Sequence, residues 1–85
     1  MTYKISFSKS AVKDLEFLPA HVTRRIFPKI ELLAYNPRPQ GCKKMQGSAN
    51  AWRIRIGDYR VVYLIFDSQI LVNVIGIKHR RDIYR

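Results

Sequence analysis

The chain has 85 residues, of which 16 are Lys or Arg and 6 are Asp or Glu, so its formal net charge is +10 at pH 7. This length holds one small domain, residues 1–85, and so high a charge points to an anionic partner: nucleic acid, an acidic membrane surface or an acidic protein. No apolar stretch approaches the ~18 residues of a spanning helix and the first residues lack an apolar signal segment, so we expect a cytoplasmic protein with no membrane partner.

The first part of the chain predicts a strand and a helix. Apolar and polar residues alternate over residues 3–7, which is the period of a strand, and we expect this strand to end at Ser8. Ser8 is a typical helix N-cap. The helical spacing of apolar residues from Lys9 to Leu18 then predicts a helix that Pro19 stops.

A second helical pattern runs from about Ala20 to Tyr35. Pro28 lies inside it, and because an interior proline removes a backbone hydrogen bond, we expect a kink or a break near Ile26 and Phe27. Turn residues in the segment 36–41 end the helical region. The apolar face of this helix comprises Val22, Ile26, Ile30 and Leu33, at intervals of four, four and three.

The rest of the chain predicts a meander of three strands, roughly residues 51–56, 59–66 and 69–77, with turns at 57–58 and 67–68. The middle strand is apolar on both faces and is therefore central in the sheet. The element order is β-α-α-β-β-β. We predict an α+β fold in which two N-terminal helices pack on one face of a small, mainly antiparallel four-stranded sheet.

Three arginines are expected on one face of the first hairpin. The period of the strand from Trp52 to Ile56 puts Arg53 and Arg55 on the face opposite Trp52, which we expect to meet the helices. A two-residue turn pairs Arg55 with Arg60, and like charges directly opposed destabilise a sheet. An external phosphate would gain from these forked, permanently charged groups. We interpret this as a phosphate-binding face; the alternative is a solvated face that keeps the sheet soluble.

The chain ends in a second basic cluster, directly after the last predicted strand. Alone, such a tail is usually a frayed and solvated end. Here Ile83 and Tyr84 can anchor it while Arg80 points toward the arginines of the hairpin. The cluster contains Lys78, His79, Arg80, Arg81, Tyr84 and Arg85.

The cysteine and histidine content excludes two classes of site. A single cysteine, Cys42, cannot form an internal disulfide, and one thiol with two scattered histidines does not make a zinc site. We therefore predict neither a metal nor any other cofactor.

Taken together, these segments resemble the RelE/ParE superfamily of bacterial toxins, and within it the RelE-like ribosome-dependent messenger-RNA endonucleases. The resemblance runs nearly the full length of the chain. It is carried by the helical pair that ends at Asn36-Pro37-Arg38-Pro39, the stretch Lys43-Lys44-Met45-Gln46-Gly47, the hairpin from Trp52 to Tyr63, and the ending His79-Arg80-Arg81-Asp82-Ile83-Tyr84-Arg85.

The resemblance implies the toxin of a type II toxin–antitoxin system. Such an enzyme enters the ribosomal A site and cuts the bound mRNA by driving a ribose 2′-hydroxyl onto the adjacent phosphate, without a metal, and so inhibits translation. The implied partners are the ribosome, the message and a cognate acidic antitoxin, encoded by an adjacent gene, that masks the basic face.

The resemblance also implies roles for individual residues. Arg53 and Arg55 match two basic strand residues, Arg60 matches the phosphate-binding arginine, and Arg80 and Tyr84 match a C-terminal arginine and tyrosine. Arg60 and Arg80 would hold the scissile phosphate and neutralise its growing charge. Tyr84 would stack on a base or accept a proton. Further candidates for RNA or phosphate binding are Lys43, Lys44, Lys78 and Arg81.

The chain departs from the family pattern where proton transfer is concerned. Members often carry a lysine where this chain has Arg53 and Arg55, and arginine does not release a proton at neutral pH. Histidine is the side chain that ordinarily changes charge near pH 7, so His79 is a candidate general acid or base, against the alternative of a surface histidine. Two other functions stay open: a non-enzymatic DNA gyrase inhibitor of the ParE type, and an inactive RNA-binding relative.

Overall fold

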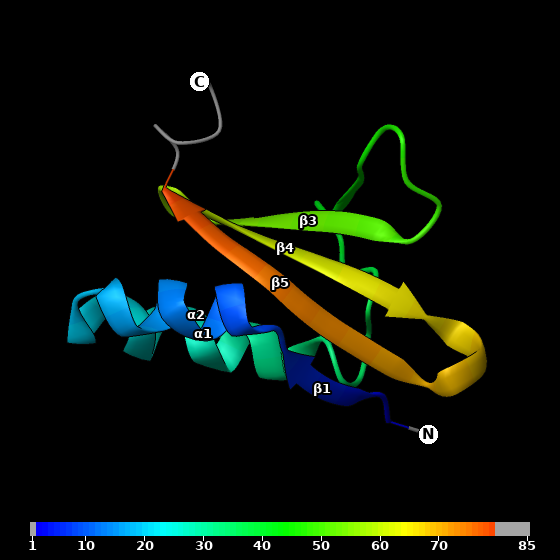
Figure 1. Ribbon diagram of the computed structural model, residues 1–85, viewed down its shortest axis with the longest axis horizontal. Helices are drawn as coiled ribbons and strands as arrows, with labels where there is room; N and C mark the ends of the chain where they lie inside the picture. Colours follow the sequence, from blue (N-terminus) through cyan, green and yellow to red (C-terminus); the bar gives the residue numbers. More distant parts are fainter. Residues whose placement is uncertain (1, 80–85) are drawn as a thin grey trace.

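The computed structural model describes residues 2–79, which form a five-stranded mixed sheet with two helices packed on one face (Figure 1). The strand order is β1-β5-β4-β3-β2. The elements are β1 (Lys4–Phe7), α1 (Lys9–Phe17), α2 (Ala20–Leu32), β2 (Lys43–Lys44), β3 (Ala51–Ile56), β4 (Tyr59–Phe66), a 3-10 turn (Asp67–Gln69) and β5 (Leu71–His79).

The sheet is mainly antiparallel, as the sequence predicts: only β1 pairs in parallel, with β5, among the pairings of the described strands. The predicted number of four strands is wrong by one. The additional strand, β2, has two residues, Lys43 and Lys44, which pair with Arg53 and Trp52. Two lysines carry no alternating pattern, so the sequence gives no signal for this strand.

Helix α1 begins and ends as predicted. The Ser8 side chain caps it by accepting a hydrogen bond from the Ala11 N–H at 3.1 Å, and Leu18 closes it before Pro19. The helix also protects the edge of β5 beyond the four residues that pair with β1. There, a carboxylate oxygen of Asp14 accepts a hydrogen bond from the Ile77 N–H at 2.9 Å, which satisfies a donor that β1 does not reach.

Helix α2 is continuous from Ala20 to Leu32, so of the kink or break predicted near Ile26 and Phe27 the break does not occur. Pro28 is exposed, and the carbonyl of Arg24 that loses its partner can therefore be hydrated. The helix also ends earlier than Tyr35. Residues 33–36 leave it through a turn in which the N–H groups of Ala34 and Tyr35 donate to carbonyls three residues earlier.

The β3–β4 hairpin has the predicted register, with Ile56 opposite Tyr59 and Arg55 opposite Arg60. The next strand differs: β5 begins and ends two residues later than the expected 69–77. The 3-10 turn extends to Gln69, where the sequence predicts the start of the strand, and Ile70 adopts a left-handed backbone conformation (φ 51°) before β5 begins.

The core lies between the helices and the sheet. As predicted, Ile54 and Ile56 face it and are each 8% exposed, while Trp52 is half-buried against its border. The hydroxyl of the buried Tyr63 donates to the Pro37 carbonyl at 2.7 Å, and burial raises the pKa of this phenol. The fully buried large side chains are Tyr63, Ile26, Ile30, Leu33, Val61, Val72 and Val74.

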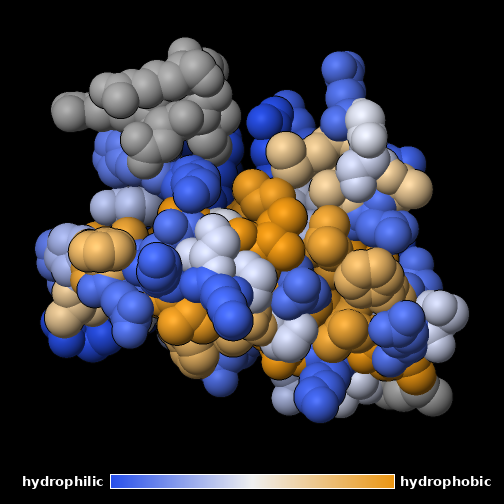
Figure 2. Space-filling model, viewed as in Figure 1, coloured by the Kyte–Doolittle hydropathy of each residue, from blue (hydrophilic) through white to orange (hydrophobic). Residues whose placement is uncertain are grey.

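The surface is mixed in character. Figure 2 shows hydrophilic residues spread over one face of the molecule, with hydrophobic residues gathered toward its middle. Within residues 2–79, no helix is long and apolar enough to span a membrane. The large apolar side chains that remain exposed are Val12, Phe17, Phe27, Leu32 and Tyr35.

Candidate nucleic-acid interface

Four basic residues converge on the sheet face that is turned away from the core. Because paired residues in antiparallel strands share a face, Arg55 lies beside Arg60, and Lys43 lies beside Arg53. Together with Gly41 they line a concavity of about 210 Å³. We call Arg53, Arg55, Arg60 and Lys43 the arginine cluster.

The members of the arginine cluster differ in exposure. Arg55 and Lys43 are exposed, whereas Arg53 and Arg60 are half-buried, and the Nη1 atom of Arg60 is buried. The Nε of Arg55 donates to the carbonyl of Gly57 at 3.2 Å. In the part of the chain that the structure describes, neither Arg53 nor Arg55 forms an ion pair. Their charge is therefore available to an external anion.

The strands place the like charges side by side and leave a hollow between them. Such an arrangement is unfavourable for an isolated sheet and becomes favourable when an anion enters the hollow. A phosphodiester fits this chemistry, because guanidinium groups donate paired hydrogen bonds to phosphate oxygens. A partly buried arginine such as Arg60 acts more strongly than an exposed one, since less water screens it.

Lys78 and Lys44, which the sequence analysis also predicts for the site, do not line the hollow. Lys78 pairs with Arg60 and shares its face, but its Nζ lies 3.3 Å from a carboxylate oxygen of Asp14. Lys44 pairs with Trp52 and therefore belongs to the opposite face. Three further predicted residues, Arg80, Arg81 and Tyr84, lie outside the described residues.

His79 lies apart from the arginine cluster. It pairs with Tyr59, on the face that carries the helices, and the two rings meet edge to face with centroids 5.0 Å apart. His79 lines a pocket of about 270 Å³ together with His21 and Arg25 of α2. The structure therefore does not bring this histidine to the hollow between the arginines.

An ionic network that the sequence did not suggest holds the loop that leads into β2. The Nη2 of Arg38 lies 2.8 Å from Asp67 Oδ2, and the Tyr3 hydroxyl donates to Asp67 Oδ1 at 2.6 Å. The Arg38 hydrogen bond lowers the pKa of Asp67, and the bond to Asp67 raises the pKa of Tyr3. The Arg38 guanidinium also lies over the Trp52 ring, 5.2 Å from its centroid.

This network fixes the backbone segment between α2 and β2 that leads to the arginine cluster. Arg38 lies between α2 and Gly41 in the sequence, and its contacts with Asp67 and Trp52 attach that segment to the end of β4 and the start of β3. The buried hydroxyl of Tyr63 holds Pro37 beside it. The backbone that delivers Gly41 and Lys43 to the hollow is therefore fixed by contacts on the other side of the sheet.

Comparison with known families decides what kind of protein carries this site. The model of the ParE toxin of type II toxin–antitoxin systems, parDE, matches residues 5–84. The chain belongs to the RelE/ParE superfamily of type II toxins. The resemblance and the fold that the sequence predicts are thereby confirmed.

Individual relatives carry RelE names. Toxin RelE3 of Methanocaldococcus jannaschii is 34% identical over 95% of this chain and 94% of its own length. The mRNA interferase toxin RelE of Escherichia coli K12 is 26% identical over 99% of this chain and 92% of its own length. The archaeal RelE–RelB complex from Pyrococcus horikoshii OT3 contains a similar chain, with a TM-score of 0.82 and 32% identity over 94% of this chain and 97% of that one.

Proposed function

We propose that this toxin is a ribosome-dependent endoribonuclease that cuts messenger RNA in the ribosomal A site and so inhibits translation in the cytoplasm. The observation that carries the proposal is the arginine cluster, in which Arg53, Arg55 and Arg60 surround one hollow of phosphate-binding chemistry. The E. coli relative that spans almost the whole chain is named an mRNA interferase, which supports the same reaction.

In the proposed reaction the 2′-oxygen of a ribose forms a bond to the adjacent phosphorus while the bond from phosphorus to the 5′-oxygen breaks. One proton leaves the 2′-hydroxyl and one is delivered to the 5′-oxygen. Arg55 and Arg60 would bind the non-bridging oxygens and stabilise the charge that grows on them in the transition state. This step needs no metal.

The arginine cluster does not supply a group for proton transfer, because arginine stays protonated at neutral pH. His79 lies on the other face of the sheet. We propose that Tyr84 and Arg80, which the family resemblance adds, complete the site after β5. We further propose that the ribosome aligns the 2′-hydroxyl with the phosphate, so that orientation supplies much of the rate acceleration.

We also propose an acidic antitoxin as the physiological partner, encoded by an adjacent gene and masking the basic face. The charge of +10 favours an acidic protein. The P. horikoshii relative was solved as a complex with RelB. A chain of the intact E. coli RelBE toxin–antitoxin complex is also similar to this chain.

The test is to add the purified chain to programmed ribosomes and, separately, to naked message, and to map the cut ends. We expect cleavage on the ribosome only, slowed about 10²–10³-fold by Arg60→Ala, as when one donor to a developing oxyanion is removed. Arg24→Ala is the matched control, because Arg24 is an exposed arginine of α2 that lines none of the described pockets.

Intact message in both samples would contradict the nuclease function. The matching family model is described as a ParE toxin, so the next assay in that case is supercoiling by DNA gyrase in the presence of the chain. Inhibition of gyrase would establish the non-enzymatic alternative, and no effect in either assay would indicate an inactive RNA-binding relative.

A further inference from the structure

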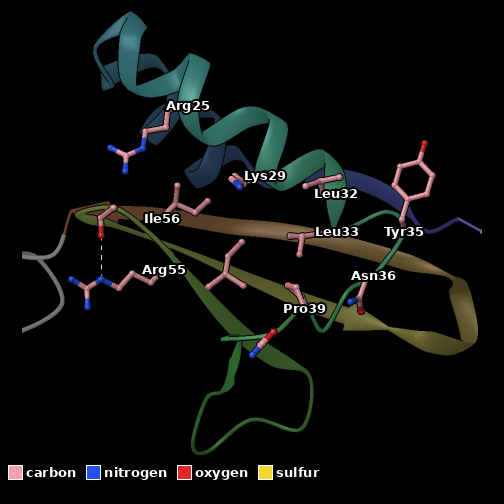
Figure 3. A pocket seen from close by; sticks show the side chains of 12 residues that line it. Arg25, Lys29, Leu32, Leu33, Tyr35, Asn36, Pro39, Arg55 and Ile56 are labelled. Atoms are coloured by element: carbon pink, nitrogen blue, oxygen red, sulfur yellow. Dashed lines mark hydrogen bonds between the residues drawn. The ribbon is translucent and has the colours of Figure 1, made fainter.

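Arg60 has a cationic neighbour on each side of it in the sheet. Arg55 of β3 and Lys78 of β5 both pair with it, so three positive side chains lie in a row on one face. Each neighbour is held by a contact of its own. The Nε of Arg55 donates to the Gly57 carbonyl at 3.2 Å (Figure 3). The Nζ of Lys78 lies 3.3 Å from Oδ2 of Asp14, so this second contact comes from a carboxylate on α1.

A β-bulge decides which face of the sheet carries Lys78. Two adjacent residues of β4 pair with Val74 and Gly76, so Ile75 between them has no partner on β4. Val74 faces the core, and regular alternation would turn Lys78 the same way. The extra residue reverses the alternation, so Ile77 faces the core and Lys78 shares the face of the arginine cluster. A slip of one residue here would turn Lys78 toward the core.

The edge of β5 beyond the bulge is held by α1 and its N-cap, and not by a strand. β1 pairs with β5 as far as Val74, and Figure 1 shows that β1 ends well short of the C-terminal end of β5. From there the Ser8 Oγ donates to the Ile75 carbonyl at 3.4 Å, and the Asp14 Oδ2 accepts from the Ile77 N–H at 2.9 Å. Only 20% of the Asp14 side chain is exposed, so little water competes with it for this donor.

We propose that Asp14 is a positioning residue of the nuclease. Its carboxylate binds the N–H of Ile77 and the ammonium group of Lys78, and thereby fixes the last residues of β5 after the bulge. Lys78 stays on the face of the arginine cluster, and residues 80–85 continue the chain from a fixed point. This inference deepens the proposed function and rests on it, because that proposal completes the site with residues that follow β5.

Asp14 also offsets a repulsion within the row of cations. Lys78 and Arg60 are directly opposed, and like charges at such positions repel each other. The carboxylate attracts the Lys78 ammonium group toward α1 and therefore away from the Arg60 guanidinium. Arg60 lines the hollow of the arginine cluster and Lys78 does not, so the hollow stays open to a phosphate.

The kinetic test compares Asp14→Ala with Asp14→Asn in single-turnover cleavage of ribosome-bound message. Alanine removes the acceptor for the Ile77 N–H, whereas asparagine keeps an acceptor oxygen and removes the charge. At saturating programmed ribosomes we expect Asp14→Ala to cleave at least about 10-fold more slowly, since misplacement by about 1 Å costs on the order of 100-fold in rate. The half-saturating ribosome concentration should change less than about twofold, and Asp14→Asn should keep a rate within about threefold of the wild type.

Two further variants of α1 are the matched controls. Glu16→Ala removes an exposed carboxylate that forms no ion pair among residues 2–79, and it should cleave at the wild-type rate. Leu15→Ala removes an apolar side chain that packs against the core, so it should lower the free energy of unfolding while its folded fraction cleaves at the wild-type rate. A loss of rate in Leu15→Ala as large as that in Asp14→Ala would overturn the proposal, because Asp14 would then act through general stability.

Amide hydrogen exchange tests the hold on β5 without any nuclease activity. Asp14→Ala should speed exchange of the Ile77 N–H at least about 10-fold, while Val72, in the half of β5 that pairs with β1, should change less than about twofold. Asp14→Asn should leave both amides close to the wild type. If Asp14→Ala lacks cooperative unfolding, Asp14→Ser, whose hydroxyl lies one bond closer to its own backbone, replaces it with the same expected direction.

The outcomes separate this inference from the proposed function. Cleavage by Asp14→Ala at the wild-type rate, or by Asp14→Asn as slowly as by Asp14→Ala, would overturn the positioning role. A raised half-saturating concentration in Asp14→Ala would also overturn it, because Asp14 would then act in ribosome binding. If the wild-type chain leaves the message intact, the proposed function fails. Exchange at Ile77 then decides alone whether Asp14 holds β5, and an unchanged rate in Asp14→Ala would show that it does not.

Discussion

The two faces of the β3–β4 hairpin are built from alternating residues of the same strands, yet one face stabilises the fold and the other brings like charges together. On the helix side, Val61 and Tyr63 are completely buried and complete the core. On the other side, Arg55 and Arg60 are directly opposed and repel each other. Stability and anion binding are therefore separated by a single residue step along each strand, so substitutions on the two faces should have separable effects.

The largest expected effect is on the core face. Tyr63→Ala should lower the free energy of unfolding by about 3–5 kcal/mol, since it removes a buried aromatic ring. Tyr35→Ala makes the same change at a side chain that is 74% exposed and should stay within about 0.5 kcal/mol of the wild type. Urea denaturation measures both, and equal losses would show that burial in this face does not govern stability.

On the arginine face, Arg55→Ala should change stability in the opposite direction. It relieves the repulsion with Arg60 and should raise the free energy of unfolding by roughly 0.2–1 kcal/mol, while it slows cleavage on the ribosome. Denaturation and cleavage are measured on the same preparation. A variant that is destabilised and still cleaves at the wild-type rate would reverse the assignment of this face.

The smallest effect is expected at the surface network of Arg38, Asp67 and Tyr3. Arg38 lowers the pKa of Asp67, so the folded state gains stability above the unfolded pKa of about 3.9 and loses it as the pH falls through the lower folded pKa. Asp67→Asn should therefore flatten the decline of stability below about pH 4. Asp58→Asn removes an exposed carboxylate that forms no ion pair among residues 2–79 and serves as the control.

Much of the difference between the two hairpin faces can be predicted from the sequence, because alternation of apolar and polar residues with a period of two is a strong local signal for a strand. Alternation over residues 52–56 and the Gly57-Asp58 turn predict the hairpin, its register and the shared face of Arg55 and Arg60. The order of helices and strands along the chain is predicted in the same way, from the spacing of apolar residues. The predicted break at Pro28 failed for a local reason, since an exposed proline leaves a carbonyl that water can satisfy.

The parts that the sequence did not predict depend on contacts between distant residues. Asp67 binds Arg38 and Tyr3 across separations of 29 and 64 residues, for which no local pattern exists. Which face of the sheet carries His79 depends on the register between β4 and β5, and the irregularity between Val62 and Tyr63 shifts that register. The hollow lined by Leu33, Ile54 and Arg55 likewise forms only when α2 and β3 are brought together.

The most direct test of the central claim is to replace Arg53, Arg55 and Arg60 together by alanine and to measure single-turnover cleavage of ribosome-bound message. We expect a cooperatively folded protein that leaves the message intact. Cleavage at a rate close to that of the wild type would contradict it, because the arginine face would then not hold the scissile phosphate.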